Sequence, residues 1–365
     1  MGRKRPDYVG RFILDARLSM YTLVKYSPVL HDRWDEFAAK YGSIFHTIAL
    51  KKLLEENFGY TDLYHCLMDK SGDIRAILPM VSGKNILQAK VAVSLPFINY
   101  LDFCHDGSIR PADIFPYLEQ LQIQNAAKYL QVRLKGYSRP VDGWQQNTEN
   151  STFVLPLSGS GQDVLALSSG SNRNHTRKVY KNNYFDVSFD QANLAEFYKV
   201  YQKRMHELGS PAPTLEFFQS FFRYFPDQAQ LLTVLDRLKG SVVGGMLLIA
   251  SSTDKTLYYP YGANLVEYNS KYLNNFMYFE AIKLGQRLGM EYLDLGRSPL
   301  DSGTYRFKRQ WGATAHPLNY LSYFGKNTAT VPDKDNMAVF INIWQRLPRP
   351  LVNYLGARLI KNVLP

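Results

Sequence analysis

The most informative stretch of this chain reads Leu293-Asp-Leu-Gly-Arg-Ser-Pro-Leu-Asp-Ser-Gly-Thr-Tyr-Arg-Phe-Lys-Arg-Gln-Trp-Gly312. It begins as a short apolar strand and breaks at Gly296. A loop rich in Gly, Pro and Ser then exposes Arg297 and Ser298, and the chain returns with Lys308 near Trp311. Polar and cationic side chains in a loop after a buried strand are where a rigid scaffold often places binding and catalytic groups. We therefore expect a functional site at this loop.

The elements around this stretch occur twice in the same order. In the second half the pattern predicts strands over 230–236, 242–249 and 256–261, a helix over about 271–288 and a strand over 292–295. The first half repeats this order over 63–69, 74–81, 90–97, about 112–128 and 129–134, and helical pairs at about 31–57 and 193–224 precede the two sets. Matching order at similar spacing predicts two copies of one α/β unit.

A meander, a helix and a returning strand are the element order of a GNAT-type acyltransferase domain. The expected fold class is therefore α/β with mixed sheets (α+β), built as two tandem GNAT-like domains. Boundaries follow from composition: the first domain over 1–155 with an N-terminal extension, and the second over 156–325 after the loop Pro156-Leu-Ser-Gly-Ser-Gly161. A basic amphipathic tail over 326–365 completes the chain. Its mix of apolar and basic residues suits an anionic membrane surface, and a helix docked on the body explains it equally well.

The bulk composition sets further limits. The chain has 365 residues, 45% of them apolar, which favours two domains and excludes general disorder. A net charge of +11 suggests phosphate-bearing partners, although many proteins are mildly basic without one. The two cysteines and seven histidines show no metal-ligand spacing, so we expect no metal and no cofactor. Neither a signal-peptide pattern nor a membrane-spanning run is present, so we expect a cytoplasmic protein. If the tail binds lipid, the protein is peripheral on the inner face of the plasma membrane.

Positive charge concentrates in one segment of the second half. Arg173, Arg177 and Lys181 stand four residues apart, so a helix would carry them on one face, with Lys178 flanking it. Like charges at this spacing repel one another. Either an external anion balances the row or it is a solvated surface. Guanidinium suits phosphate because its fork donates two hydrogen bonds at once, so we expect these four residues to bind phosphate, together with Arg297 and Ser298.

The candidate reaction site lies where the central strands end. In GNAT-like domains the acyl donor sits between two parallel strands that splay apart, here those ending near Tyr261 and at 292–295. Tyr261 and Asn264 are candidate donors to a developing oxyanion, and Lys308 is a candidate positive charge. The plainer readings are a sheet aromatic for Tyr261 and a turn residue for Asn264. For Asp294 we expect an ion pair with Arg297 or Lys308.

Several segments resemble one family, the Fem-type peptidyl (aminoacyl) transferases such as FemAB and FemX, and within it the branch associated with the PEP-CTERM/exosortase system. The segments are Val93-Ser-Leu-Pro-Phe97, Arg173–Lys181, Leu208-Gly-Ser-Pro211, Tyr261-Gly-Ala-Asn264 and the opening stretch. The resemblance implies two GNAT-like domains and transfer of an amino acid from aminoacyl-tRNA to an amine of a cell-envelope precursor. Lys308 matches the family's Phe-Lys motif, where the lysine is thought to help stabilise the reacting carbonyl.

Two other functions remain open at this point. One is an acyltransferase that uses acyl-CoA or an acyl carrier protein on an exopolysaccharide sugar. No Gln/Arg-x-x-Gly-x-Gly/Ala loop follows the third strand of either half, and that loop normally cradles the pyrophosphate of CoA. The other is a non-catalytic, glycolipid-binding pair of GNAT domains. The expected partners are thus aminoacyl-tRNA or another acyl donor, a phosphate-bearing cell-envelope precursor, and an anionic membrane.

Overall fold

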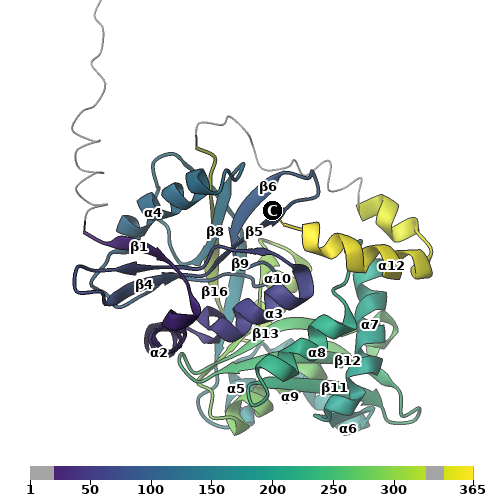
Figure 1. Ribbon diagram of the computed structural model, residues 1–365. Coiled ribbons are helices and arrows are strands. Elements are labelled where there is room, and N and C mark those ends of the chain that lie inside the picture. The colour runs from purple at the N-terminus through teal and green to yellow at the C-terminus, as the bar shows by residue number, and fades with distance from the viewer. Residues whose placement is uncertain (1–19, 326–340, 365) are drawn as a thin grey trace, which may run out of the picture.

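Both halves of the chain contribute to one long, mixed β-sheet (Figure 1). The computed structural model describes residues 20–325 and 341–364. The first half contains β1 (Thr22–Lys25), α2 (His31–Tyr41), α3 (Ile48–Phe58), β2 (Thr61–Asp62), β3 (His65–Met68), β4 (Ile74–Leu78), β5 (Met80–Lys84), β6 (Lys90–Ser94), β7 (Cys104–His105), α4 (Pro111–Gln124), β8 (Leu130–Lys135) and β9 (Trp144–Pro156).

The second half has a similar order after two added helices, with three strands between α8 and α9 where the first half has six between α3 and α4. It contains α5 (Gly161–Leu167), α6 (Gly170–Asn182), β10 (Phe185–Ser188), α7 (Leu194–Glu207), α8 (Leu215–Tyr224), β11 (Ala229–Asp236), β12 (Val242–Ser251), β13 (Thr256–Asn264), α9 (Leu273–Arg287), β14 (Tyr292–Asp294), β15 (Ser298–Pro299), α10 (Gly303–Gln310) and β16 (Thr314–Tyr323). The tail contains α12 (Arg349–Leu359), followed by the short helix η5 (Ile360–Asn362). The repeated order confirms the predicted α/β unit in two copies.

The large sheet has 12 strands, and its main path runs β10-β11-β12-β13-β14-β9-β16-β8-β6-β5-β2. The last strand of each half sits away from its own half. β9 from the first half pairs with β14 of the second, and β16 from the second half pairs with β8 of the first. β9 and β16 also pair with each other. This exchange joins the halves through backbone hydrogen bonds, and the boundary at 155/156 stays a prediction.

The predicted strand over 74–81 is two strands. Pro79 has no N–H to donate to a ladder, and the chain changes sheets there. β4 belongs to a separate four-stranded sheet of order β1-β3-β4-β7, and β5 belongs to the large sheet. The sequence analysis also missed β9, β16 and the helix α10.

Aromatic side chains pack across the junction between the halves. Phe97 stacks on Phe58 with ring centroids 4.5 Å apart and lies 5.8 Å from Phe217 of α8. Phe217 in turn meets Tyr261 at 5.7 Å. These residues belong to one hydrophobic core that draws on both halves. Such interdigitated packing leaves little freedom for one half to move against the other.

The described part of the tail, residues 341–364, is docked on the body. The buried Trp344 lies close to Gly356 of α12, and Gln345 donates to the carbonyl of Glu207 at the end of α7. Farther along, Tyr60 of the first half donates to the carbonyl of Lys361 at 2.7 Å. The tail therefore contacts both halves, in agreement with the docked alternative. Residues 1–19 and 326–340, which include the N-terminal extension and the start of the tail, lie outside the described residues. Among the helices that are described, none is long and apolar enough to cross a bilayer.

Candidate active site

The two central parallel strands of the second half separate after three paired residues. β13 and β14 pair from Thr256↔Tyr292 to Tyr258↔Asp294. Beyond this point β13 follows β12 as far as Asn264, while the chain after β14 turns away at Gly296, whose φ is +74°. The turn opens a gap between the strands, at the place where the sequence predicts the reaction site.

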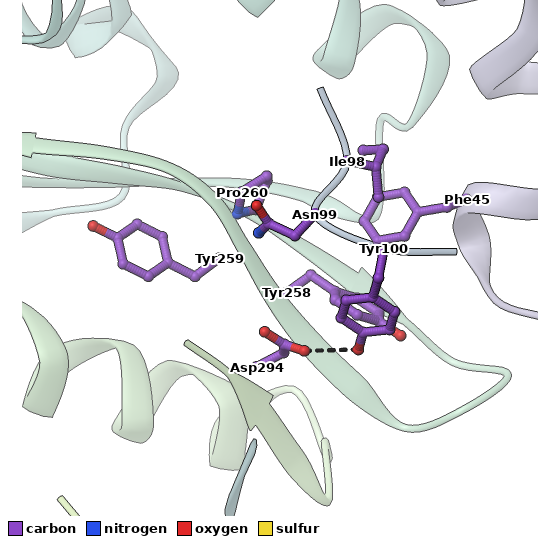
Figure 2. Close-up of a pocket in the computed structure, with 8 residues that line it drawn as sticks. All are labelled: Phe45, Ile98, Asn99, Tyr100, Tyr258, Tyr259, Pro260 and Asp294. Carbon is purple, nitrogen blue, oxygen red and sulfur yellow. Dashed lines mark hydrogen bonds between the residues drawn. The ribbon is translucent and has the colours of Figure 1, made fainter. Parts of the chain in front are cut away.

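A narrow cleft lies in this gap between the strands, and residues from both halves line it (Figure 2). Its volume is about 20 Å³, room for one small group such as a carbonyl oxygen. The second half provides Tyr258, Tyr259, Pro260 and Asp294, and the first half provides Phe45, Ile98, Asn99 and Tyr100. The cleft is therefore a shared feature of the two repeats.

Among the described residues, Asp294 is the one carboxylate in the wall of this cleft, and it is only 2% exposed. One oxygen accepts from the Tyr100 hydroxyl at 2.7 Å, as Figure 2 shows. The other accepts from the Thr152 hydroxyl at 2.8 Å and from the Gly296 N–H at 2.7 Å. The expected ion pair with Arg297 or Lys308 is wrong, since the Lys308 ammonium donates to main-chain carbonyls and the Arg297 guanidinium donates to a tyrosine hydroxyl. Neutral donors satisfy the buried charge instead.

Lys308 lies behind the loop that follows β14. It is 6% exposed, and its ammonium donates to the carbonyls of Gly296 at 2.9 Å and Arg297 at 3.0 Å. Burial lowers the pKa of Lys308 to about 8; the charge of Asp294 opposes this shift, and that of Arg297 adds to it. Both hydrogen bonds fix the turn at Gly296, so the geometry gives Lys308 a positioning role for the loop.

Tyr261 and Asn264 do not line the cleft. The Tyr261 hydroxyl donates to the carbonyl of Phe97 at 3.2 Å inside the aromatic core. The Asn264 amide donates to Asn269 at 2.8 Å and holds the turn after β13. A bulge explains why Tyr261 points elsewhere. Leu247 faces Tyr261 and Ile249 faces Tyr258, so one intervening residue opposes both Tyr259 and Pro260 and the alternation of faces shifts.

Arg297 and Ser298 follow the same turn and differ in exposure. Arg297 is exposed and donates to the Tyr320 hydroxyl at 3.3 Å. Ser298 is 1% exposed, and its hydroxyl has no hydrogen-bond partner among the described residues. Ser298 pairs in β15 with Ser151 of β9. The loop therefore presents one cation at the surface and one unpartnered hydroxyl inside.

The predicted basic helix is present as α6, but its four cations are not equivalent. Arg173 donates to the carbonyls of Ala166 and Ser168, so it caps the C-terminal end of α5. Arg177, Lys178 and Lys181 are exposed, and Lys178 lies 5.3 Å from the centre of the Tyr272 ring. In Figure 1, α6 lies at the bottom of the second half, away from α2 and β4 of the first. Phosphate binding by these residues stays a prediction.

The corresponding gap in the first half is filled by its own chain. β6 and β8 pair at Ala92↔Leu130 and Val93↔Gln131, as β13 and β14 do in the second half. Past that point the Leu101 N–H donates to the carbonyl of Arg133 at 2.8 Å, and Asp102 accepts from the Lys135 N–H at 2.6 Å. Burial raises the pKa of Asp102 to about 6. One short segment thus closes the first-half gap with residues 101–102 and walls the second-half cleft with residues 98–100.

Sequence reasoning missed most of the cleft wall. Asn99 and Tyr100 lie in a first-half loop, far along the chain from the strands they face, and Thr152 belongs to the exchanged strand β9. One sequence pattern could have predicted this wall: the polar and aromatic pair Asn99-Tyr100 directly follows an apolar strand. The same pattern predicts the functional loop after the strand at 292–295.

The comparisons with known proteins agree with this architecture. Residues 171–309 match the family model of an acetyltransferase (GNAT) domain. No curated protein matches the sequence. Among solved structures, FemX aligns with a TM-score of 0.62 and 13% identity over 88% of this chain and 100% of FemX. L-PGS from Bacillus licheniformis aligns at 0.54 and 13%, covering 93% and 98%. A tandem GNAT protein from the clavulanic acid biosynthesis pathway aligns at 0.54 and 9%, covering 84% and 99%.

These similarities establish the fold. The chain has two GNAT-like units arranged as in FemX, and the predicted resemblance to Fem-type proteins is confirmed at that level. The narrower resemblance to the branch associated with PEP-CTERM stays a prediction.

Proposed function

We propose that this protein is an aminoacyltransferase that moves an amino acid from an activated ester, such as aminoacyl-tRNA, to an amine of a cell-envelope precursor. The observation that carries the proposal is the cleft between β13 and β14, which holds a buried carboxylate and an unpaired amide and is walled by both halves. The structural similarity to FemX and L-PGS supports transfer to a cell-envelope acceptor.

The segment after β13 argues against CoA as the donor. In CoA-dependent domains, free backbone N–H groups at this place cradle the pyrophosphate. Here the N–H of Leu265 donates to Val243, that of Tyr268 to Leu265 and that of Tyr272 to Asn269. The first bond continues the pairing with β12, and the other two belong to the short helix η4 (Val266–Lys271) and its C-terminal cap. All three occupy donors that a pyrophosphate would need. A donor that lacks this diphosphate, such as an amino acid esterified to tRNA, fits the segment better.

The reaction forms a C–N bond and breaks a C–O bond. The amine attacks the ester carbonyl, and the ribose oxygen leaves with the proton that the amine loses. The Asn99 amide makes no hydrogen bond to the described residues and lies beside Pro260 in the cleft (Figure 2). We assign it as donor to the oxyanion, in place of Tyr261 and Asn264. We assign the carboxylate of Asp294, held by Tyr100, to attracting and orienting the amine.

A transfer assay tests this assignment. The assay follows radiolabelled amino acids from a pool of charged tRNA into a cell-envelope precursor extract, with acetyl-CoA in a parallel arm. Loss of one oxyanion donor lowers kcat by about 10²–10³. We therefore expect the kcat of Asn99→Ala to be lower than that of wild type by this factor, with an unchanged melting temperature. Lys70→Ala, on an exposed first-half turn, is the control and should retain full activity. Label that enters product from acetyl-CoA and not from charged tRNA would refute the proposal.

The acyl-CoA alternative draws support from the GNAT family model over residues 171–309. It requires the chain after β13 to rearrange, because η4 occupies its backbone donors. The parallel arm with acetyl-CoA decides between the two donors. A protein without transferase activity would show neither transfer nor any change in Asn99→Ala.

We propose in addition that the tail rests on an anionic membrane. One face of α12 is buried at Val352, while Leu351, Tyr354 and Arg358 lie on the opposite, exposed face. Residues 341–364 contain four basic residues and no acidic one. Exposed apolar side chains among cations suit the headgroup region of anionic lipid.

A further inference from the structure

Two arginines from different halves converge on one tyrosine beside the cleft. Tyr320 of β16 stands opposite Arg133 of β8 in the antiparallel ladder, and the Arg133 guanidinium carbon lies 5.0 Å from the centre of its ring. Arg297 donates to the Tyr320 hydroxyl at 3.3 Å. The strand exchange creates this arrangement, because β16 carries Tyr320 from the second half into the sheet of the first.

Neither arginine has an acidic partner in the part of the chain that the structure describes. The other hydrogen bonds of Arg133 go to neutral groups, the Gln131 side chain at 3.1 Å and the Ile98 carbonyl at 3.5 Å. No carboxylate oxygen among the described residues lies within 4 Å of either guanidinium, whereas Arg75, Arg110, Arg204, Arg223 and Arg237 all form such ion pairs. Arg133 is partly buried; burial lowers its pKa, and the charge of Arg297 lowers it further. Two unbalanced guanidinium groups near a partly buried site favour an external anion.

The position of the pair relates it to the reaction cleft. The Tyr320 hydroxyl donates to the carbonyl of Asn99 at 3.1 Å, and Asn99 lines the cleft. Arg297 follows Gly296, whose N–H binds Asp294. An anion held by the arginines would therefore lie next to the residues that we assign to the reacting carbonyl and amine.

We propose that Arg133 and Arg297 form a phosphate-binding site, shared between the halves, for the acceptor substrate. Each guanidinium offers a planar fork that matches two phosphate oxygens. Tyr320 spaces the two forks, one from its ring face and one from its hydroxyl. The acceptor class is an amine-bearing molecule with a phosphate or diphosphate group, and this identification of the substrate rests on the proposed transferase function.

Calorimetric titration with inorganic pyrophosphate tests the site without any need for activity. Wild type, Arg133→Gln, Arg297→Gln and the double variant are compared, and the exposed Arg139→Gln is the control. We expect each single variant to raise Kd at least tenfold. The Kd of the double variant should be little higher than that of either single variant, because one ligand needs both guanidinium groups. Arg297→Lys keeps the charge and loses the planar guanidinium, so its Kd for pyrophosphate should lie between those of wild type and Arg297→Gln.

Several results would overturn the site: no saturable binding by wild type, a Kd within twofold of wild type in both single variants, or an equal loss in Arg139→Gln. Succinate that binds as tightly as pyrophosphate would overturn the assignment to phosphate. Since Arg297 is exposed, Arg297→Gln keeps the test valid if Arg133→Gln fails to fold. The two proposals fail separately. If wild type transfers the amino acid from charged tRNA and the arginine variants bind pyrophosphate as wild type does, only this site is refuted. If the variants lose pyrophosphate binding and wild type shows no transferase activity, only the proposed function is refuted.

Discussion

Replacing Lys308 by methionine tests whether a charged amine is held inside the loop after β14. Burial lowers its pKa from 10.5 to about 8. At neutral pH the lysine is protonated in the folded and the unfolded chain, and the folded protein bears the cost of the buried charge. The lowered pKa corresponds to a cost of about 3 kcal/mol, at about 1.4 kcal/mol per pH unit. Methionine has a similar length and no charge, so Lys308→Met removes this cost together with two hydrogen bonds.

The sign of the pH dependence follows from proton binding. Between about pH 8 and 10.5 the unfolded chain keeps the Lys308 proton and the folded chain has lost it. The free energy of unfolding of the wild type therefore rises with pH in this range, relative to the variant. Urea unfolding followed by tryptophan fluorescence at pH 7, 8, 9 and 10 gives the difference between the two proteins. We expect it to be flat up to about pH 7.5 and to grow by about 2.5 kcal/mol by pH 10.

Taking the difference cancels other groups that titrate in both proteins, such as the tyrosines. The exposed Lys70→Met is the control and should show no growing difference from wild type. A difference between wild type and Lys308→Met that stays constant from pH 7 to 10 would show that the ammonium is not desolvated, and would contradict a charged amine held inside the loop.

Three more perturbations follow from the site and the tail. Gly296→Ala should lower the free energy of unfolding by about 1–2 kcal/mol because of its left-handed backbone, and should also lower kcat because a Cβ there lies 3.1 Å from the Tyr259 carbonyl. The control Gly72→Ala has the same backbone strain in open space and should leave kcat unchanged. Arg177→Ala/Lys181→Ala should weaken binding of charged tRNA and reduce the slope of log K against log salt by about 1–2, while an unchanged slope would make α6 a solvated surface. The double variant Arg349→Glu/Arg358→Glu should bind phosphatidylglycerol vesicles at least tenfold more weakly in a sedimentation assay, because each basic residue near the membrane contributes about 1 kcal/mol. An equal loss of binding in the exposed pair Lys70→Glu/Lys128→Glu would contradict a specific role of the tail.

The repeated α/β unit could be predicted because it depends on local patterns. Apolar strands, turn glycines and helical periodicity are visible in short windows of sequence. The same reasoning predicted α6 from the spacing of Arg173, Arg177 and Lys181, and the site loop from Gly296 and the residues after it. These features required no knowledge of which strands pair.

The exchanged strands could not be predicted in this way. β9 begins Trp144-Gln-Gln-Asn-Thr-Glu149, whose polar residues are mostly exposed, so apolar periodicity does not mark it as a strand. Its partner β16 lies far away along the chain, and only their pairing stabilises both. Because the exchange brings Thr152 to Asp294 and Tyr320 to Arg133, two parts of the site depend on contacts that the sequence does not display.

The bulge in β13 limited the prediction for a second reason. A regular strand would place Tyr259 and Tyr261 on one face, and either could then serve the reaction. Pro260 interrupts this alternation, so Tyr261 enters the aromatic core while Tyr259 and Pro260 line the cleft. Asp294 shows a similar limit, since its buried charge is met by a hydroxyl from the opposite half.

The most direct test of the shared cleft is single-turnover transfer of a radiolabelled amino acid from charged tRNA, measured for wild type, Tyr100→Phe and Asp294→Asn. We expect wild type to transfer the label, and both variants to remain folded and slow the chemical step, Asp294→Asn by at least a hundredfold. The first-half residue and the second-half residue would then act on one reaction. Transfer at the wild-type rate by both variants would show that the reaction takes place elsewhere.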